Sequence, residues 1–186
     1  MEETNNQAFI DGQNLAISTK CAKTPWVIDL KRFRTFLAER FNVSEAYYFI
    51  GAFDSSKQNL YSALQRFGYI VIFREHACGV LSHKKGNVDT DIVFLVMKKL
   101  VEKEDFDRVI LVSGDGDYWR MVDYLIKSNK FCKLLVPNKY RLSSLYRLRM
   151  PDSYRMYLDD SSTKRKIILK KRKKQSKKDN DGDKTK

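Results

Sequence analysis

Four aspartates in this chain have the type and setting that divalent-cation chemistry needs. In the stretch VSGDGDYW, Asp115 and Asp117 stand two positions apart between glycines, directly after an apolar run. Asp11 follows a shorter apolar run in the same way, and Asp89 lies near the start of an amphipathic segment. Carboxylates that gather at one point raise one another's pKa unless a cation neutralises them. If the fold brings these residues together, the pattern predicts a metal site.

The ligand type indicates which metal and which reaction to expect. Oxygen ligands without a Cys or His beside them favour Mg²⁺ or Mn²⁺ over zinc. Such ions complete their shell with substrate oxygens, for which a phosphodiester is the expected donor. Two ions ~3.5 to 4 Å apart would activate a water and stabilise the leaving oxygen of an in-line displacement. Ser113 and Asn14 are expected to support the site by holding a carboxylate or a metal-bound water through hydrogen bonds.

Asp91 is the alternative to Asp89. Residues two apart on a helix point about 200° apart, so the two side chains cannot both face one site. We expect Asp89 to be the ligand and keep Asp91 as the reserve.

The elements that must position these acids follow from hydrophobic periodicity. Strands alternate with helices of ten or more residues, which implies βαβ units and a mostly parallel sheet of five or six strands, with helices on both faces in an α/β three-layer sandwich. All strands of such a sheet end at one edge, where ligands bind, so Asp11, Asp115 and Asp117 should meet there. Strands are expected at 8–10, 46–53, 69–73, 108–114, 133–136 and, at an edge, 154–158; helices are expected at 27–41, 55–67, 88–104, 117–128 and 142–148.

Most of the net charge lies at the C-terminal end. The chain of 186 residues carries +13, but the segment 164–186 holds 12 Lys and Arg against three Asp, a surplus of +9 that leaves +4 for the preceding residues. We therefore expect one domain at 1–160 and a disordered basic tail at 161–186. The tail should bind phosphate backbones with strong salt dependence, unless it is only a solubilising segment. The residues expected to contact nucleic acid are Lys84, Lys85, Arg120, Lys170, Lys171, Arg172, Lys173 and Lys174.

Cysteine usage and hydropathy predict the compartment. The three cysteines are more than fifty residues apart and form no C-x-x-C, which argues against a disulfide framework and for a reducing compartment. No segment approaches the ~18 apolar residues that a membrane span needs. The expectation is a cytoplasmic protein without a membrane partner, and KKRKK matches a nuclear import signal if the host cell has a nucleus. The sequence gives no indication of oligomeric state.

Three blocks of the sequence resemble the signature blocks of NYN domains, a branch of the PIN-like nuclease superfamily. They are FIDGQNL (9–15), KKGNVD (84–89) and ILVSGDGDYWRMVDYL (110–125), and they occur in family order. The resemblance implies a PIN-like fold and a Mg²⁺- or Mn²⁺-dependent ribonuclease that acts on single-stranded or structured RNA.

The resemblance also assigns residues block by block. D-G-x-N falls on Asp11 and Asn14, S-G-D-x-D falls on Ser113, Asp115 and Asp117, and K-G-x-D falls on Lys85, Gly86 and Asp89. The last block has one residue more between Gly and Asp than many members have, which keeps Asp91 as the alternative.

Two other functions are compatible with parts of the pattern. A PIN-like module with an idle metal site would bind RNA through its tail and basic residues without cutting it. Phosphatases of the haloacid-dehalogenase type and Toprim enzymes also place acids at strand ends. The phosphatase needs a second Asp two residues after Asp11, where this chain has Gln13, and Toprim needs a Glu at the end of its first strand.

Overall fold

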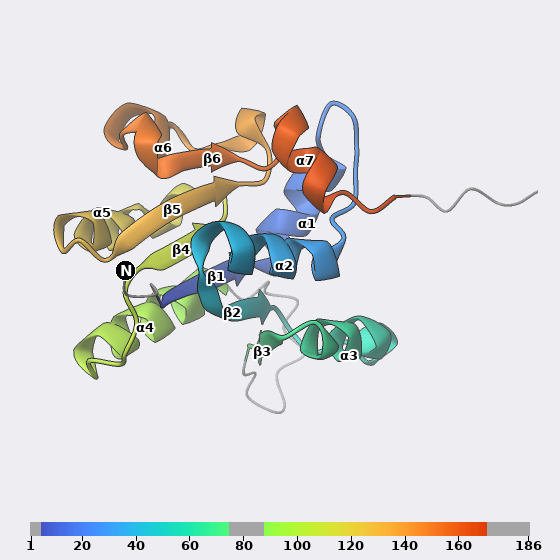
Figure 1. The fold of residues 1–186 in the computed structure, drawn as a ribbon, viewed down its shortest axis with the longest axis horizontal. Coiled ribbons are helices and arrows are strands. Elements are labelled where there is room, and N and C mark those ends of the chain that lie inside the picture. The colour runs from blue at the N-terminus through green and yellow to red at the C-terminus, as the bar shows by residue number, and fades with distance from the viewer. Residues whose placement is uncertain (1–4, 75–87, 171–186) are drawn as a thin grey trace, which may run out of the picture.

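The computed structural model describes residues 5–74 and 88–170, which form one six-stranded parallel sheet with helices on both faces (Figure 1). The strand order is β3-β2-β1-β4-β5-β6, and every neighbouring pair is parallel. The predicted α/β sandwich with a mostly parallel sheet is therefore confirmed. The strands are β1 (Asn6–Asp11), β2 (Val43–Ile50), β3 (Tyr69–Phe73), β4 (Val109–Val112), β5 (Phe131–Val136) and β6 (Arg155–Tyr157).

Two apolar layers sandwich the sheet because successive strand residues point to opposite faces. In β1, Ala8 and Ile10 face the first layer, and Phe9 faces the second. Both faces of the central strands are buried, and this explains their continuous apolar character. The first layer is covered by α1 (Gly12–Lys20), α2 (Leu30–Phe41), α3 (Gln58–Arg66) and α7 (Ser161–Ile167), and the second by α4 (Val88–Val101), α5 (Trp119–Lys127) and α6 (Ser144–Arg149).

Short 3₁₀ helices join several of these elements, three of them after strands and one, η4, directly before β6. They are η1 (Ser55–Lys57), η2 (Gly116–Tyr118), η3 (Lys139–Arg141) and η4 (Asp152–Tyr154). Two of them, η2 after β4 and η3 after β5, bear on the site described below.

Helix α1 was not predicted, since Asp11 and Gly12 were expected to end the first strand in a loop. Instead the helix begins at Gly12, directly after β1, and the Asp11 side chain caps it by accepting a hydrogen bond from the Asn14 N–H at 2.8 Å. A Cβ at Gly12 would lie 2.4 Å from Cε1 of Tyr48 and 2.6 Å from the carbonyl oxygen of Phe49. Glycine is therefore required by this close approach to β2, not by a turn.

The described part of the chain extends past the expected domain boundary at 160. Residues 161–167 form α7, whose Ile167 is fully buried against the layer that includes α2. The backbone continues as an antiparallel bridge between Ile28 and Ile168 and a hydrogen bond from Leu169 N–H to the Val27 carbonyl. The expectation of a disordered segment from 161 onward was thus wrong for residues 161–170, because two isoleucines among the lysines are enough to dock the helix.

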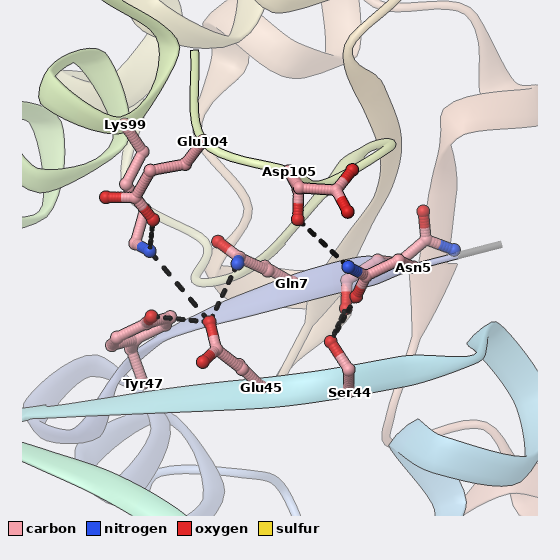
Figure 2. Close-up of polar contacts among 9 residues, drawn as sticks. Asn5, Gln7, Ser44, Glu45, Tyr47, Lys99, Glu104 and Asp105 are labelled. Atoms are coloured by element: carbon pink, nitrogen blue, oxygen red, sulfur yellow. Dashed lines mark hydrogen bonds and ion pairs between the residues drawn. The ribbon is translucent and has the colours of Figure 1, made fainter. Parts of the chain in front are cut away.

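A buried lysine interrupts the apolar face of α4. Lys99 is only 5% exposed, and its ammonium pairs with Glu104 and, at 3.9 Å, with Glu45, while it lies 4.9 Å from the centre of the Tyr47 ring (Figure 2). Glu45 also accepts hydrogen bonds of 2.7 Å from Gln7 and Tyr47. These contacts fasten the C-terminal end of α4 to β1 and β2, so the helix is fixed at the end opposite Asp89.

Within the described ranges, no helix is both long enough and apolar enough to cross a bilayer. Cys21 and Cys132 are free thiols. Cys78 lies outside the described residues.

Candidate metal centre

The site lies between the neighbouring strands β1 and β4, where the order in which the chain adds strands to the sheet reverses. From β1 the chain adds β2 and β3 on one side, and then returns to add β4, β5 and β6 on the other. The loops after β1 and β4 therefore diverge at the carboxyl edge and leave a crevice, the usual ligand position in an open parallel sheet. Because Ile10 pairs with Val112, Asp11 is level with Ser113, and Asp115 follows two residues beyond.

The loop after β4 is held by its own side chains and by α1. Ser113 Oγ accepts a hydrogen bond from the Asp115 N–H at 3.1 Å, and Asp115 Oδ1 accepts one from the Asp117 N–H at 3.1 Å. Asn14 Oδ1 accepts a hydrogen bond from the Gly114 N–H at 3.1 Å, which ties the first turn of α1 to this loop. Ser113 and Asn14 therefore orient the backbone that carries the acids, whereas we expected them to support the site by holding a carboxylate or a metal-bound water.

Three of the predicted acids converge. One carboxylate oxygen from each of Asp89, Asp115 and Asp117 lies within 4.8 Å of the other two. Asp89 comes from the first turn of α4, and the other two come from the turn that leads from β4 into η2. The reserve candidate, Asp91, is not part of this group. The three oxygens are close enough to coordinate one cation.

The fourth acid, Asp11, lies behind this group. Its side chain is almost fully buried, at 4% exposure, and its two oxygens accept hydrogen bonds from the Asn14 N–H and the Tyr118 hydroxyl. Burial raises the pKa of the Asp11 carboxyl, and the charges of Asp89 and Asp115 raise it further, against the lowering effect of the two hydrogen bonds. Asp11 thus lies on the buried side of the three acids and is connected to Asp89 through the Tyr118 hydroxyl.

Tyr118 connects the buried acid to the converging ones, a role that sequence reasoning did not assign to it. Its side chain is fully buried, and its hydroxyl lies 3.0 Å from Asp11 Oδ2 and within hydrogen-bonding distance of Asp89 Oδ1. Burial, together with the charges of Asp11 and Asp89, raises the pKa of Tyr118 far above its usual value, so the hydroxyl stays a donor. In a sequence, an aromatic residue at the start of a helix gives no indication that its hydroxyl will connect two acidic side chains.

A hollow of about 290 Å³ opens in front of the acids. It is bounded by the turn that carries Asp115 and Asp117, by Asn14 and by the segment after β5, which contributes Arg141, Ser143 and Leu145. That segment packs closely on the turn, since a Cβ at Gly116 would lie 2.3 Å from Ser143 Oγ. Sequence reasoning missed Arg141, although the loop after any parallel strand must lie at this same edge.

The residues predicted to bind nucleic acid are only partly described. Arg120 is exposed in the first turn of α5 but does not line the hollow, and Lys170 is exposed at the end of the described chain. In Figure 1 the described chain ends just after α7, on the side to which the strands point. Lys84, Lys85 and the basic run of Lys171, Arg172, Lys173 and Lys174 lie outside the described residues.

Comparison with known proteins shows what this chain resembles. Residues 7–149 match the family model of the NYN domain. A segment of 126 residues is 29% identical to the low amplitude and bright protein LabA of Synechococcus elongatus, covering 63% of this chain and 65% of LabA, which is less than two thirds of that protein's length. A crystal structure of a protein of unknown function from Vibrio parahaemolyticus superposes with a TM-score of 0.68 at 22% identity, covering 91% of this chain and 99% of that one.

Proposed function

Because this chain belongs to the NYN domain family, a branch of the PIN-like nuclease superfamily, we propose that it is a Mg²⁺- or Mn²⁺-dependent ribonuclease that cuts RNA internally at phosphodiester bonds. One observation carries the proposal. Asp89, Asp115 and Asp117 come from two distant segments, and each places an oxygen within 4.8 Å of the others, next to a hollow that Asp115 and Asp117 line.

The donor set fits a hard divalent cation. Among the residues that the structure describes, the group consists of three carboxylates without a Cys or His, and Mg²⁺ and Mn²⁺ prefer such oxygen ligands. Without a cation, three negative charges at this separation would repel one another. When bound, the ion would supply positive charge to offset the charge that builds up on the reacting phosphate, and would make a water more acidic.

The remaining residues of the site bind and orient. Asp11 and Tyr118 hold Asp89 in position from the buried side. Arg141, at the rim of the hollow, offers a planar guanidinium that can bind two phosphate oxygens at once. A strand of RNA that enters the hollow would therefore have the acids on one side and the Arg141 guanidinium on the other.

The test is cleavage of end-labelled RNA with Mn²⁺ or Mg²⁺ by the wild type and by Asp89→Asn, Asp115→Asn and Asp117→Asn. We expect each substitution to lower the rate by about 10²-fold or more, as loss of a preorganised electrostatic group does. Asp91→Asn is the matched control, because it removes a charge from the same turn of α4 but lies outside the group. Its rate should stay near that of the wild type.

The competing function, an idle PIN-like module that binds RNA, predicts a different result. Binding without cleavage by the wild type under every metal condition, undiminished by Asp115→Asn, would support the module and contradict the nuclease.

A further inference from the structure

The segment after β5 is strongly basic and lies against the acidic site. Between Asn138 and Met150 it contains four Lys and Arg and no Asp or Glu. The segment around its 3₁₀ helix η3 packs on the turn that carries the acids. A Cβ at Gly114 would be 3.1 Å from the Arg141 carbonyl oxygen, and the Ser143 N–H donates to the Gly114 carbonyl at 3.0 Å. The positive charge is therefore fixed next to the hollow.

This segment is held rigidly from beneath. The Asn138 side chain, only 2% exposed, donates to the Ser18 carbonyl at 3.0 Å and accepts from the Tyr140 N–H at 3.0 Å. From α6, the Arg147 guanidinium donates to the carbonyls of Lys139 and Tyr140 at 3.5 and 3.4 Å. Side chains that project from η3 thus start from a preorganised backbone, which lowers the entropic cost of binding.

Tyr140 projects from this backbone with its ring largely in solvent. The side chain is 70% exposed, and the Lys139 ammonium lies 5.2 Å from the centre of the ring. One side of the ring is thus beside a cation, and most of the rest is open. An open aromatic face flanked by cations is the usual platform for an unpaired nucleobase.

The cations beside Tyr140 are not neutralised by any acidic side chain that the structure describes, and the Arg147 guanidinium keeps N–H donors beyond those it directs to the Lys139 and Tyr140 carbonyls. Among the ion pairs of the described residues, none involves Lys139, Arg141 or Arg147. Arg141 lines the hollow in front of Asp115 and Asp117, and Tyr140 is the residue just before it. A cation at the hollow is therefore followed directly by an exposed aromatic side chain on the same rigid segment.

We propose that Lys139, Tyr140, Arg141 and Arg147, the η3–α6 surface, bind a single-stranded stretch of RNA, with one unpaired base stacked on Tyr140 and neighbouring phosphates on the arginines. A paired base would be stacked within its helix and could not offer its face, so the surface selects single strands. The inference rests on the proposed function, in which a phosphodiester of the same strand reaches the acids.

The experiment measures binding without cleavage. A fluorescein-labelled 12-nucleotide RNA, and the same RNA annealed to its complement, are titrated with the full chain carrying Asp115→Asn in EDTA, with polarisation as the readout. We expect Tyr140→Ala to weaken single-strand binding by roughly 5- to 100-fold, as loss of a base–aromatic stack does, and to leave duplex binding nearly unchanged. Tyr140→Phe, which keeps the ring, should bind as tightly as the chain with Tyr140.

The arginines are tested in the same assay. Arg141→Ala with Arg147→Ala should weaken binding and reduce the slope of log affinity against log salt by up to ~0.7 for each phosphate that is no longer neutralised. Two matched controls should leave both quantities nearly unchanged. One is Tyr124→Ala, which removes an exposed tyrosine from α5, and the other is Arg66→Ala with Arg108→Ala, which removes two exposed arginines near the opposite edge of the sheet.

A crosslink provides a second readout that needs no substitution in the surface. RNA with one 4-thiouridine, irradiated with the Asp115→Asn chain, should label the peptide that contains Tyr140. Labelling confined to other segments, or a Tyr140→Ala variant that binds single strands as tightly as before, would overturn the proposal and leave the surface to another class of partner. Selective single-strand binding by a chain that never cuts RNA would support this surface while contradicting the nuclease.

Discussion

At the scale of single residues, the Tyr118 hydroxyl decides how Asp89 is presented. It is the link between a buried carboxyl and one of the three that converge. A carboxylate with a fixed partner needs less reorganisation when a cation arrives, in the way that outer hydrogen bonds orient metal ligands in general.

Tyr118→Phe is expected to raise the Mn²⁺ concentration for half-maximal cleavage by roughly 10-fold, because the loss of one hydrogen bond to a charged group costs about 1.5 kcal/mol. The rate at saturating Mn²⁺ should change much less. A metal titration of the cleavage rate measures both. Tyr69→Phe is the matched control, since it removes a buried hydroxyl that donates to the Leu30 carbonyl, away from the acids. Equal Mn²⁺ midpoints for the two variants would refute the positioning role.

Asp11 should make stability depend on pH. Burial raises the pKa of this carboxyl above the ordinary value of 3.8, so the folded state binds its proton more tightly than the unfolded state does. Stability from this residue is therefore fully present below the ordinary pKa and is lost as pH rises through the folded pKa. Relative to Asp11→Asn, which keeps the cap on α1, the wild type should lose free energy of unfolding as pH increases above 3.8.

Urea unfolding of both proteins in EDTA across this range gives the comparison. A difference between them that stays constant with pH, or grows in favour of the wild type, would be inconsistent with the raised pKa.

At the scale of elements, the close approach of α1 to β2 sets the position of both Asp11 and Asn14. The helix starts immediately after β1, and its first residue has no room for a side chain. Asn14 then reaches the loop after β4. The packing of α1 on β2 thus helps to position the loop after β4, and this loop carries Asp115 and Asp117.

Gly12→Ala is expected to lower the free energy of unfolding by roughly 1 to 3 kcal/mol, because the added methyl group overlaps Tyr48 and the β2 backbone and such overpacking forces both to shift. Gly51→Ala serves as control, since nothing lies within 4 Å of a Cβ at that position. Urea unfolding should separate the two variants clearly. Similar stabilities would show that α1 moves away from β2 without cost.

At the scale of the whole molecule, α7 joins the end of the described chain to the first apolar layer. Figure 1 shows α7 next to α2, and Arg32 of α2 donates to the carbonyls of Ile168 and Arg165 at 3.1 and 3.2 Å. The segment with most of the positive charge therefore starts inside the fold. Its attachment at this side of the sheet is consistent with a role of the tail in holding RNA near the acids.

Two truncations test this arrangement. Ending the chain after residue 160 should cost at least about 2 kcal/mol of stability, because Ile167 is fully buried and a buried side chain of this size contributes about that amount. Ending it after residue 170 should leave stability unchanged but weaken RNA binding and flatten its salt dependence. Thermal unfolding and polarisation titrations provide the readouts. Equal stability of the two truncated chains would contradict the docking of α7.

The sequence by itself determined the kind of fold and the group of residues from which the site is drawn. Apolar runs and helical spacing reflect whether a segment is buried on one face or on two. This is a local property of the sequence, so the strand β3 and the parallel α/β fold could be predicted. The placement of Asp11, Asp115 and Asp117 near one sheet edge followed from strand direction, whereas Asp89 was chosen from its position at a helix start and from the resemblance of its sequence block. The elements missed, α1 and α7, have short or lysine-rich apolar patterns, and their helical state depends on the surface they pack on.

Only the tertiary structure decided which side chains touch. Strand order and register, with Ile10 beside Val112, put Asp11 behind the other acids, close enough for Tyr118 to bridge to Asp89. The packing of η3 on the turn after β4 brought Arg141 to the hollow. These relations join residues that are as many as 107 positions apart, and they depend on distances of a few ångströms between separate elements. Hydrophobic periodicity specifies which face of a segment is buried, but not the neighbour against which it is buried.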